Sequence, residues 1–255
     1  MSSAMYANAA ADTPAPGATK PKYGPAAKPI AIPLSQDSAY FRSSAHAAAD
    51  FWALIPYYVG QQHAAGCSTA SLAMVMNAAR AGQKLGSEDK LVSEDALLDQ
   101  VKVENYPARI RGDGALHPPT GVELDPYAHV VEAALQAHGF TESKVEAFHV
   151  ADTGPKSLNL LRTALTQNEK STDDFIVINF VQSKLTDDAD AGHLAPIGAY
   201  DAKNHRVLVL DPDREYYEPY WVSDEALLAA MATLDKSATK NRGYVWIHVG
   251  KRKSS

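Results

Sequence analysis

Residues 67–80, with the sequence CSTASLAMVMNAAR, are the stretch that decides the fold. Small and apolar side chains occupy most positions, so a helix built from them is apolar on nearly every face. Such a helix belongs in the middle of a core and not on a surface. Gly82 follows shortly after and is a typical C-terminal stop. The sequence therefore predicts a central, buried helix from Cys67 to Arg80.

Four more helices are expected around this one. Their apolar spacing or end signals are found at 44–54, 125–139, 158–165 and after Ser223. In the second, Asp125 is the expected N-cap, Pro126 the first helical residue and Gly139 the stop. Ser223 is an N-cap followed by two acids at the positive end of the last helix.

Strands dominate the second half of the chain. The runs DFIVINFV (174–181) and GYVWIHV (243–249) are short and apolar, as in buried strands. The runs IGAY (197–200) and VLVL (207–210) flank the polar segment DAKNH and predict a β-hairpin. Helices followed by antiparallel strands predict an α/β fold of the α+β kind.

Composition predicts one globular domain behind a disordered arm. Of the 255 residues, 45% are hydrophobic and 21% charged, as in soluble proteins. We assign 1–34, which is rich in Ala and Pro, to the arm and 35–250 to the domain. Within the domain, a helical lobe over about 35–170 precedes a sheet lobe over about 171–250.

Net charge and hydropathy limit the partners. A net charge of -6 argues against a nucleic-acid or anionic-membrane partner, since both favour basic surfaces. No apolar run approaches the ~20 residues that span a bilayer. The cytoplasm is the default compartment, and the Ala/Pro-rich arm leaves the periplasm open. The sequence also allows a homodimer.

Cys67 is the single cysteine of the sequence. One thiol excludes an internal disulfide and a multi-cysteine zinc site, and we expect no metal site. It lies in the first turn of the predicted central helix, where unpaired N–H groups and the helix dipole stabilise a thiolate. Cys67 is therefore a nucleophile, a small buried hydrophobe or an incidental thiol.

A base and an orienting acid for Cys67 are expected from the hairpin. His193 precedes its first strand and Asp211 follows its second, at nearly equal distances from the turn. Hairpin pairing then brings the two side chains into contact, and the acid fixes the imidazole tautomer. The competing interpretation is a surface His–Asp pair, and His63 is the local competitor as base.

Gln61, six residues before Cys67, is the candidate oxyanion donor. Its amide and the backbone N–H of Cys67 could together bind the oxyanion formed on acyl attack. Gln62 is an equally placed alternative, and either side chain could be only a loop hydrogen bonder.

The segments that carry these residues resemble the phytochelatin synthase family and, more distantly, papain. The likeness covers Gln61 with CSTASLAMVMNAA, GHLAPIGAYD with VLVLDPDREYYEPYW, and the eighteen-residue separation of His193 and Asp211. The resemblance runs from about Phe51 to the end of the chain and is weak between about 82 and 120.

The resemblance implies a papain-like fold and the catalytic set Cys67, His193, Asp211 and Gln61. It also implies substrate-pocket residues Asn179, Gly192, Asp235 and Arg242, the last two for the γ-glutamyl group. The implied substrate is glutathione, cleaved at its Cys–Gly bond through a γ-Glu-Cys acyl-enzyme on Cys67. No cofactor is implied, but cadmium or zinc ions could be activators or part of a metal–thiolate substrate.

Departures from the family pattern bear on the reaction. Ser68 stands where the family usually has Gly, HLAP replaces HFSP, and the acidic segment TDDADA (186–191) precedes Gly192. The likeness to short bacterial members implies mainly hydrolysis, with transfer to a second glutathione giving phytochelatin as the lesser reaction. A general papain-like peptidase and a non-catalytic binding protein are the alternatives.

Overall fold

The computed structural model describes residues 30–44, 46–81, 87, 89–186, 188 and 190–250. Its α-helices are α1 (Ala49–Leu54), α2 (Cys67–Ala81), α3 (Glu94–Gln100), α4 (Tyr106–Arg111), α5 (Leu124–Ala137), α6 (Pro155–Asn168) and α7 (Asp224–Met231). Its strands are β1 (Ile32–Pro33), β2 (Lys144–His149), β3 (Asp174–Val181), β4 (Gly192–Asp201), β5 (Arg206–Val209), β6 (Tyr220–Ser223), β7 (Leu234–Asp235), β8 (Lys240–Asn241) and β9 (Gly243–His248). Short 3-10 helices are η1 (Ala39–Arg42), η2 (Ile55–Tyr57), η3 (Val103–Asn105), η4 (Gly114–Leu116) and η5 (Gln182–Lys184).

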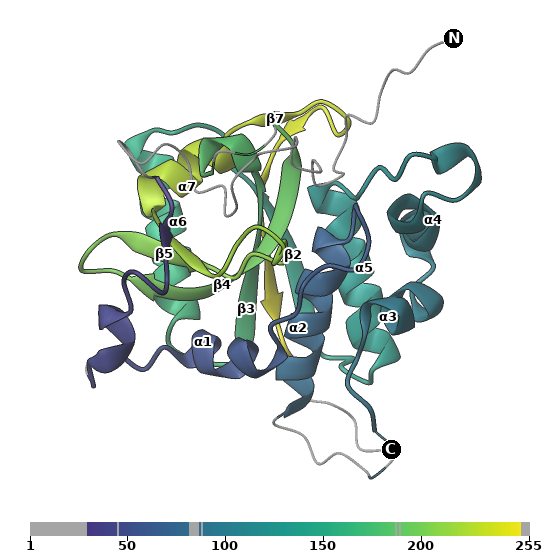
Figure 1. Cartoon of the computed structure of the whole chain (residues 1–255), viewed down its shortest axis with the longest axis horizontal. Helices are drawn as coiled ribbons and strands as arrows, with labels where there is room; N and C mark the ends of the chain where they lie inside the picture. Colours follow the sequence, from purple (N-terminus) through teal and green to yellow (C-terminus); the bar gives the residue numbers. More distant parts are fainter. Residues whose placement is uncertain are drawn as a thin grey trace.

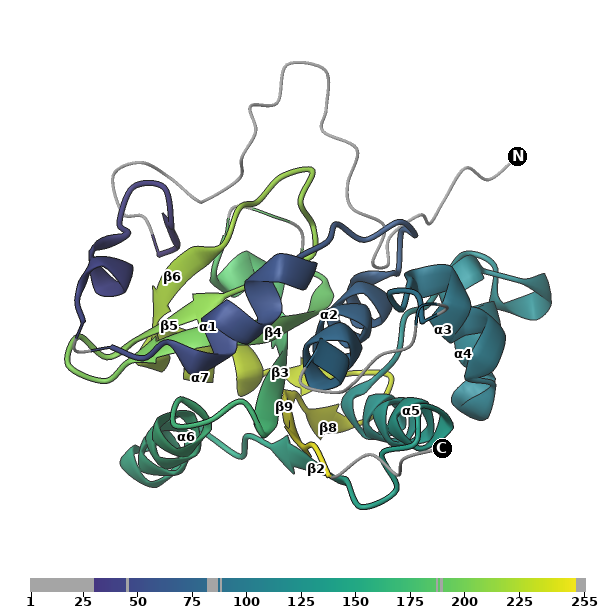
Figure 2. The same ribbon diagram turned by 90° about the horizontal axis from the view of Figure 1, so that it is seen from below.

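The main sheet has the strand order β1-β6-β5-β4-β3-β9-β2, and every neighbouring pair is antiparallel. Strands β7 and β8 form a separate two-stranded sheet. Helices α2 to α5 lie on one side of the main sheet, and α6 and α7 lie on the other (Figures 1 and 2). The α+β class predicted from the sequence is thus confirmed.

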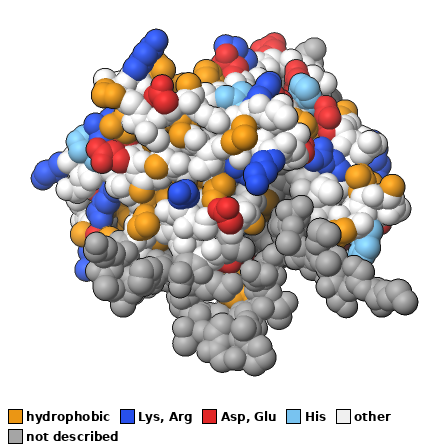
Figure 3. All heavy atoms as spheres, turned by 90° about the horizontal axis from the view of Figure 1, so that it is seen from above, with side chains coloured by type: hydrophobic (Ala, Val, Ile, Leu, Met, Phe, Trp, Pro, Cys, Tyr) orange, Lys and Arg blue, Asp and Glu red, His pale blue; other side chains and the backbone are white. Residues whose placement is uncertain are grey.

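Charged side chains of both signs are interspersed over the face shown in Figure 3. Among the described residues, no helix is both long enough and apolar enough to cross a membrane.

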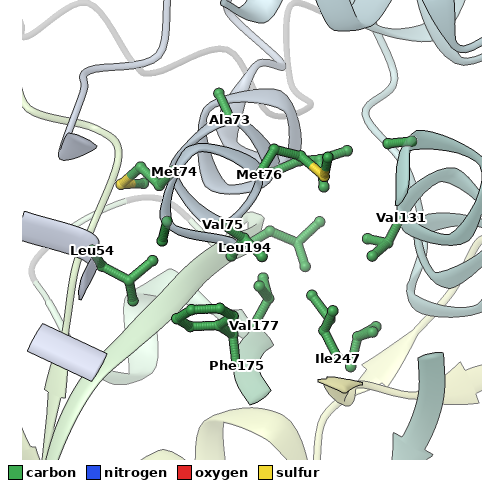
Figure 4. Close-up of a cluster of buried hydrophobic side chains, with 14 of the residues drawn as sticks. Leu54, Ala73, Met74, Val75, Met76, Val131, Phe175, Val177, Leu194 and Ile247 are labelled. Atoms are coloured by element: carbon green, nitrogen blue, oxygen red, sulfur yellow. The ribbon is translucent and has the colours of Figure 1, made fainter. Parts of the chain in front are cut away.

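Helix α2 lies at the centre of the larger core, as its sequence predicts. Fourteen of its fifteen residues are buried, from Cys67 to Arg80. Figure 4 shows Val75 and Met76 facing Leu194, Val177 and Val131, which come from β4, β3 and α5. A second core on the opposite face of the sheet contains Leu161 and Leu165 of α6 with Leu227 and Leu228 of α7. The expected stop, Gly82, lies outside the described residues.

Strand β3 occupies the predicted residues 174–181, and all of them are buried. Ser223 caps α7 as predicted, because its side chain accepts a hydrogen bond from the backbone N–H of Ala226. The predicted cap of α5 is wrong. The helix begins at Leu124, and the Asp125 carboxylate instead binds His149 (2.7 Å) and Lys240 (2.6 Å).

Two boundaries need correction. Residues 1–29 of the predicted arm lie outside the described residues, but Ile32 and Pro33 form β1 and pair with β6. The helical lobe also ends earlier than residue 170, because β2 pairs with β9 at the sheet edge. No residue of β2 is fully buried, and its sequence KVEAFH mixes charged and apolar residues, so it lacks the continuous apolar run that identified β3.

Candidate active site

Cys67 is the first residue of α2 and is buried, with 8% of its surface exposed. The next two side chains of the helix are hydrogen-bonded to the Tyr106 hydroxyl of α4. Its oxygen lies 2.9 Å from Ser68 Oγ and 3.3 Å from Thr69 Oγ1. The residue that departs from the family pattern, Ser68, thus links the start of α2 to α4.

His193 and Asp211 lie at the open end of the predicted hairpin. Strands β4 and β5 pair Tyr200 with Val207 and Ile197 with Val209, with an irregularity between these pairs. His193 Nε2 lies 2.8 Å from Asp211 Oδ1. The predicted side-chain contact is therefore present.

This pair is buried and not at the surface. Asp211 is completely buried and His193 is 6% exposed. The surface-pair interpretation is therefore wrong. The local competitor His63 faces a different acid, since its Nε2 lies 3.4 Å from Asp95 Oδ1.

Cys67 and His193 face each other across the boundary between α2 and the sheet. Burial by itself lowers the pKa of His193, but the Asp211 charge and hydrogen bond, together with a hydrogen bond and charge from Cys67, raise it well above its usual range. One helical turn after Cys67, the Ser71 hydroxyl donates to the backbone oxygen of Leu194 at 3.1 Å. Helix α2 is thus fastened to β4 beside both reacting groups.

Asp211 is held by three further hydrogen bonds. Its carboxylate accepts from the backbone N–H of Asp213 (2.9 Å) and from the Tyr220 hydroxyl (2.8 Å). Its backbone oxygen accepts from the Tyr58 hydroxyl at 2.6 Å. Every carboxylate oxygen therefore has a donor, as a buried charge requires.

Gln61 lies beside the acid segment. Its backbone N–H donates to the Pro212 oxygen at 2.8 Å, and its side-chain Oε1 is buried without a hydrogen-bond partner among the described residues. Its Nε2 makes a long contact of 3.4 Å to the Ala64 oxygen. The Gln62 side chain is exposed. Burial thus favours Gln61 over the exposed Gln62 as the candidate oxyanion donor.

The four predicted substrate-pocket residues gather next to His193. Asn179 Nδ2 donates to the His193 backbone oxygen (3.3 Å). A Cβ on Gly192 would lie 3.2 Å from Nη2 of Arg242, and the same Nη2 lies 3.8 Å from Asp235 Oδ2. Arg242 Nε and Asn179 Oδ1 are buried without a hydrogen-bond partner in the described part of the chain. Such orphaned polar atoms are what a polar ligand would satisfy.

The side of the site next to Gln61 carries acidic residues. Burial, followed by the neighbouring Asp211 charge, raises the pKa of Asp213 to about 6. Asp188 of the acidic segment accepts a hydrogen bond from the Tyr217 hydroxyl at 2.6 Å. Its negative charge also raises the pKa of Asp213. Arg214 is exposed and stacks on Tyr58, with its guanidinium carbon 4.4 Å from the ring centroid. Of the segment 186–191, Asp187 and Ala189 lie outside the described residues.

Sequence reasoning missed Tyr58, Tyr220 and Glu94 as parts of the site. Tyr220 lies in β6, a strand that is not predicted from the sequence. Glu94 reaches the site through a loop contact that no spacing rule anticipates. Among the described residues, no group of three or more His, Cys, Asp or Glu side chains is arranged to hold a metal ion.

Comparison with known proteins gives one family. The family model for phytochelatin synthase matches residues 26–244. Glutathione gamma-glutamylcysteinyltransferase 3 of Lotus japonicus is 28% identical over 212 residues, which cover 80% of this chain and 39% of that protein. Glutathione gamma-glutamylcysteinyltransferase 2 of Arabidopsis thaliana is 27% identical over 199 residues, covering 77% and 39%. The chain thus spans about two fifths of the length of these relatives.

Among solved structures, the Pseudomonas avirulence protein AvrPphB matches with a TM-score of 0.32 and 14% identity. The match covers 76% of this chain and 97% of that one.

Proposed function

Because the chain belongs to the phytochelatin synthase family, we propose that it is a cysteine enzyme that cleaves the Cys–Gly bond of glutathione. The observation that carries the proposal is the convergence of Cys67, His193 and Asp211 in a buried site that three separate segments build. A thiol, an imidazole and a carboxylate in this order are what acyl transfer through a thioester requires.

The first half-reaction releases glycine. The Cys67 thiolate attacks the carbonyl carbon of the Cys–Gly amide, and Gln61 with the Cys67 backbone N–H binds the oxyanion. His193 carries the proton that it delivers to the leaving nitrogen, which breaks the C–N bond and leaves γ-Glu-Cys as a thioester on Cys67. Asp211 stabilises the imidazolium and fixes its tautomer, because Nε2 is engaged at 2.8 Å.

The second half-reaction transfers the acyl group, and we propose water as its main acceptor. His193 removes a proton from the attacking water, and the thioester C–S bond breaks to release γ-Glu-Cys and restore the Cys67 thiolate beside the protonated His193. Asp188 and Asp213 lie on the side of the site next to Gln61, where their charges would repel the carboxylates of a second glutathione. Their repulsion supports hydrolysis over transfer to phytochelatin.

The γ-glutamyl group has a matching set of charges on the other flank. Arg242 can bind its α-carboxylate through a planar pair of N–H groups, and Asp235 can meet its α-ammonium. The buried, unpaired Nε of Arg242 and Oδ1 of Asn179 support a polar ligand here. Gly192 leaves the approach to Arg242 open, since a Cβ there would lie within 3.3 Å of its guanidinium nitrogens.

The test is an intact-mass measurement after incubation with glutathione. We expect a γ-Glu-Cys adduct on Cys67 with free glycine in solution, and neither in Cys67→Ala. His205→Ala, which removes an exposed histidine in the hairpin turn, should match the wild type. If wild-type protein gives no adduct and releases no glycine, the proposal is refuted. Cleavage of longer peptides would then identify a general peptidase. Adding cadmium and measuring phytochelatin against γ-Glu-Cys separates transfer from hydrolysis.

A further inference from the structure

Glu94 is a buried acid that the proposed reaction does not use. It is the first residue of α3 and is only 2% exposed. Its Oε1 accepts a hydrogen bond from the backbone N–H of Gln62 at 2.9 Å. Burying a carboxylate is costly, so its place here calls for a role.

The chain between Gln61 and Cys67 curves around this carboxylate. Gly66 donates its N–H to the His63 oxygen at 2.8 Å, which closes a tight turn. A Cβ on Gly66 would lie 2.8 Å from that oxygen and 3.0 Å from Glu94 Oε2, so only glycine fits. One oxygen of Glu94 thus holds the residue after Gln61, and the other abuts the residue before Cys67.

The second oxygen of this carboxylate is not hydrogen-bonded. Oε2 is buried and has no hydrogen-bond partner within the described residues. The ionisable groups around Glu94 are Asp95 on its own helix, Tyr106 of α4, Cys67 of α2 and His63 of the 61–67 loop, whose Nε2 lies 3.4 Å from Asp95 Oδ1. The pKa of Tyr106 is influenced by both Cys67 and Glu94. Burial raises the pKa of Glu94 to about 7, against the hydrogen bond from Gln62, and Asp95 raises it further.

We infer that Glu94 is a positioning residue that holds the 61–67 loop, and with it the oxyanion donor and the nucleophile, in reacting geometry. The inference rests on the proposed function for the roles of Gln61 and Cys67. Glu94 also acts through its charge. An ionised carboxylate one residue from the mouth of α2 opposes formation of the Cys67 thiolate, and a neutral one does not.

Two substitutions separate the two effects. Glu94→Gln keeps an oxygen acceptor for Gln62 but removes the charge. Glu94→Ala removes both. Because the sequence contains one cysteine, alkylation by iodoacetamide reports Cys67 alone, with no need for glutathione. Rates are measured from pH 5 to pH 9, beside kcat and KM for glycine release.

For the wild type we expect an inflection near pH 7 in the alkylation profile. Glu94→Gln should lose that inflection, alkylate about 2–5-fold faster above it, and retain more of kcat than Glu94→Ala because the acceptor for Gln62 remains. Glu94→Ala should lower kcat by about 10–100-fold, because a displacement of about 1 Å is costly in a preorganised site. The matched control is Asp99→Asn on the same helix, whose carboxylate is 71% exposed and is not among the groups that shift the pKa of Glu94, so its profile should follow the wild type.

Identical alkylation profiles for wild type and Glu94→Gln, with undiminished kcat in folded Glu94→Ala, would overturn the inference. Failure of the proposed function gives a different result. Neither the wild type nor any variant would then release glycine, while the alkylation profiles of the wild type and Glu94→Gln would still differ.

Discussion

Replacing Asp211 with Asn tests whether this carboxylate sets the charge of His193. The substitution preserves the shape of the site. An amide oxygen can still accept from His193 Nε2 and from the backbone N–H of Asp213, and the Tyr220 hydroxyl can turn to accept from the amide NH₂. What is lost is the negative charge beside the ring.

The size of the change in the pKa of His193 follows from its hydrogen bond to Asp211. A hydrogen bond to a charged group contributes about 1.5–3 kcal/mol and a neutral one about 0.5–1.5 kcal/mol, so the change is about 1–1.5 kcal/mol. One pKa unit corresponds to about 1.4 kcal/mol, so the pKa of His193 should fall by about one unit. Both groups are buried, and salt should therefore screen the effect little.

The direction in pH follows from the role of His193 as the acid for glycine release. Its pKa is raised in the folded protein, so the imidazolium is present below that pKa and is lost as the pH rises through it. Lowering the pKa moves the alkaline limb of kcat/KM to lower pH by about one unit, with about a tenfold loss within that interval.

NMR titration of the His193 ring, together with the pH profile of glycine release, measures both quantities. The control is Asp201→Asn, which neutralises another buried aspartate of the same hairpin, 3.0 Å from Arg206 and away from the site. An unchanged His193 titration in folded Asp211→Asn protein would show that Asp211 does not control the imidazole.

Two further substitutions test the pocket and the sheet. Arg242→Ala should raise KM for glutathione by about 10–100-fold with a smaller change in kcat, since an interaction with a carboxylate is lost, and Arg162→Ala on the outer helical layer should leave KM unchanged. An unaltered KM would exclude Arg242 from substrate binding. Gly243→Ala should destabilise the protein by about 3 kcal/mol or more in urea unfolding, because its Cβ would lie 1.8 Å from the Phe148 oxygen in β2. Gly154→Ala, where the nearest atom is a flexible carboxylate oxygen at 3.1 Å, is the control, and equal stability of the two variants would contradict this packing.

Periodicity and pairing predicted the framework of the site. A run of mostly small and apolar residues identified α2, an uninterrupted apolar run identified β3, and the symmetry of a hairpin placed His193 against Asp211. Each of these signals is local, or links residues that a single turn brings together. Such local features can be predicted because they leave a periodic pattern of apolar residues in the sequence.

The parts that escaped prediction depend on tertiary contacts. The Asp125 carboxylate binds His149 and Lys240 from distant strands, which local cap rules cannot anticipate. Tyr220 reaches Asp211 only because β6 pairs with β5, and Glu94 reaches Gln62 only because α3 packs on α2. In each case, packing between separate helices or strands, and not a pattern within one element, determines the role of the residue.

The Ser71–Leu194 hydrogen bond fixes where α2 packs along β4, and this packing sets the position of Cys67 relative to His193. A helix advances about 1.5 Å per residue, so a slip of even one residue along that seam would carry the sulfur out of reach of the ring. Substitutions that only loosen the seam should therefore give proteins with native circular dichroism that no longer turn over. On heating, turnover should fade before the cooperative melt.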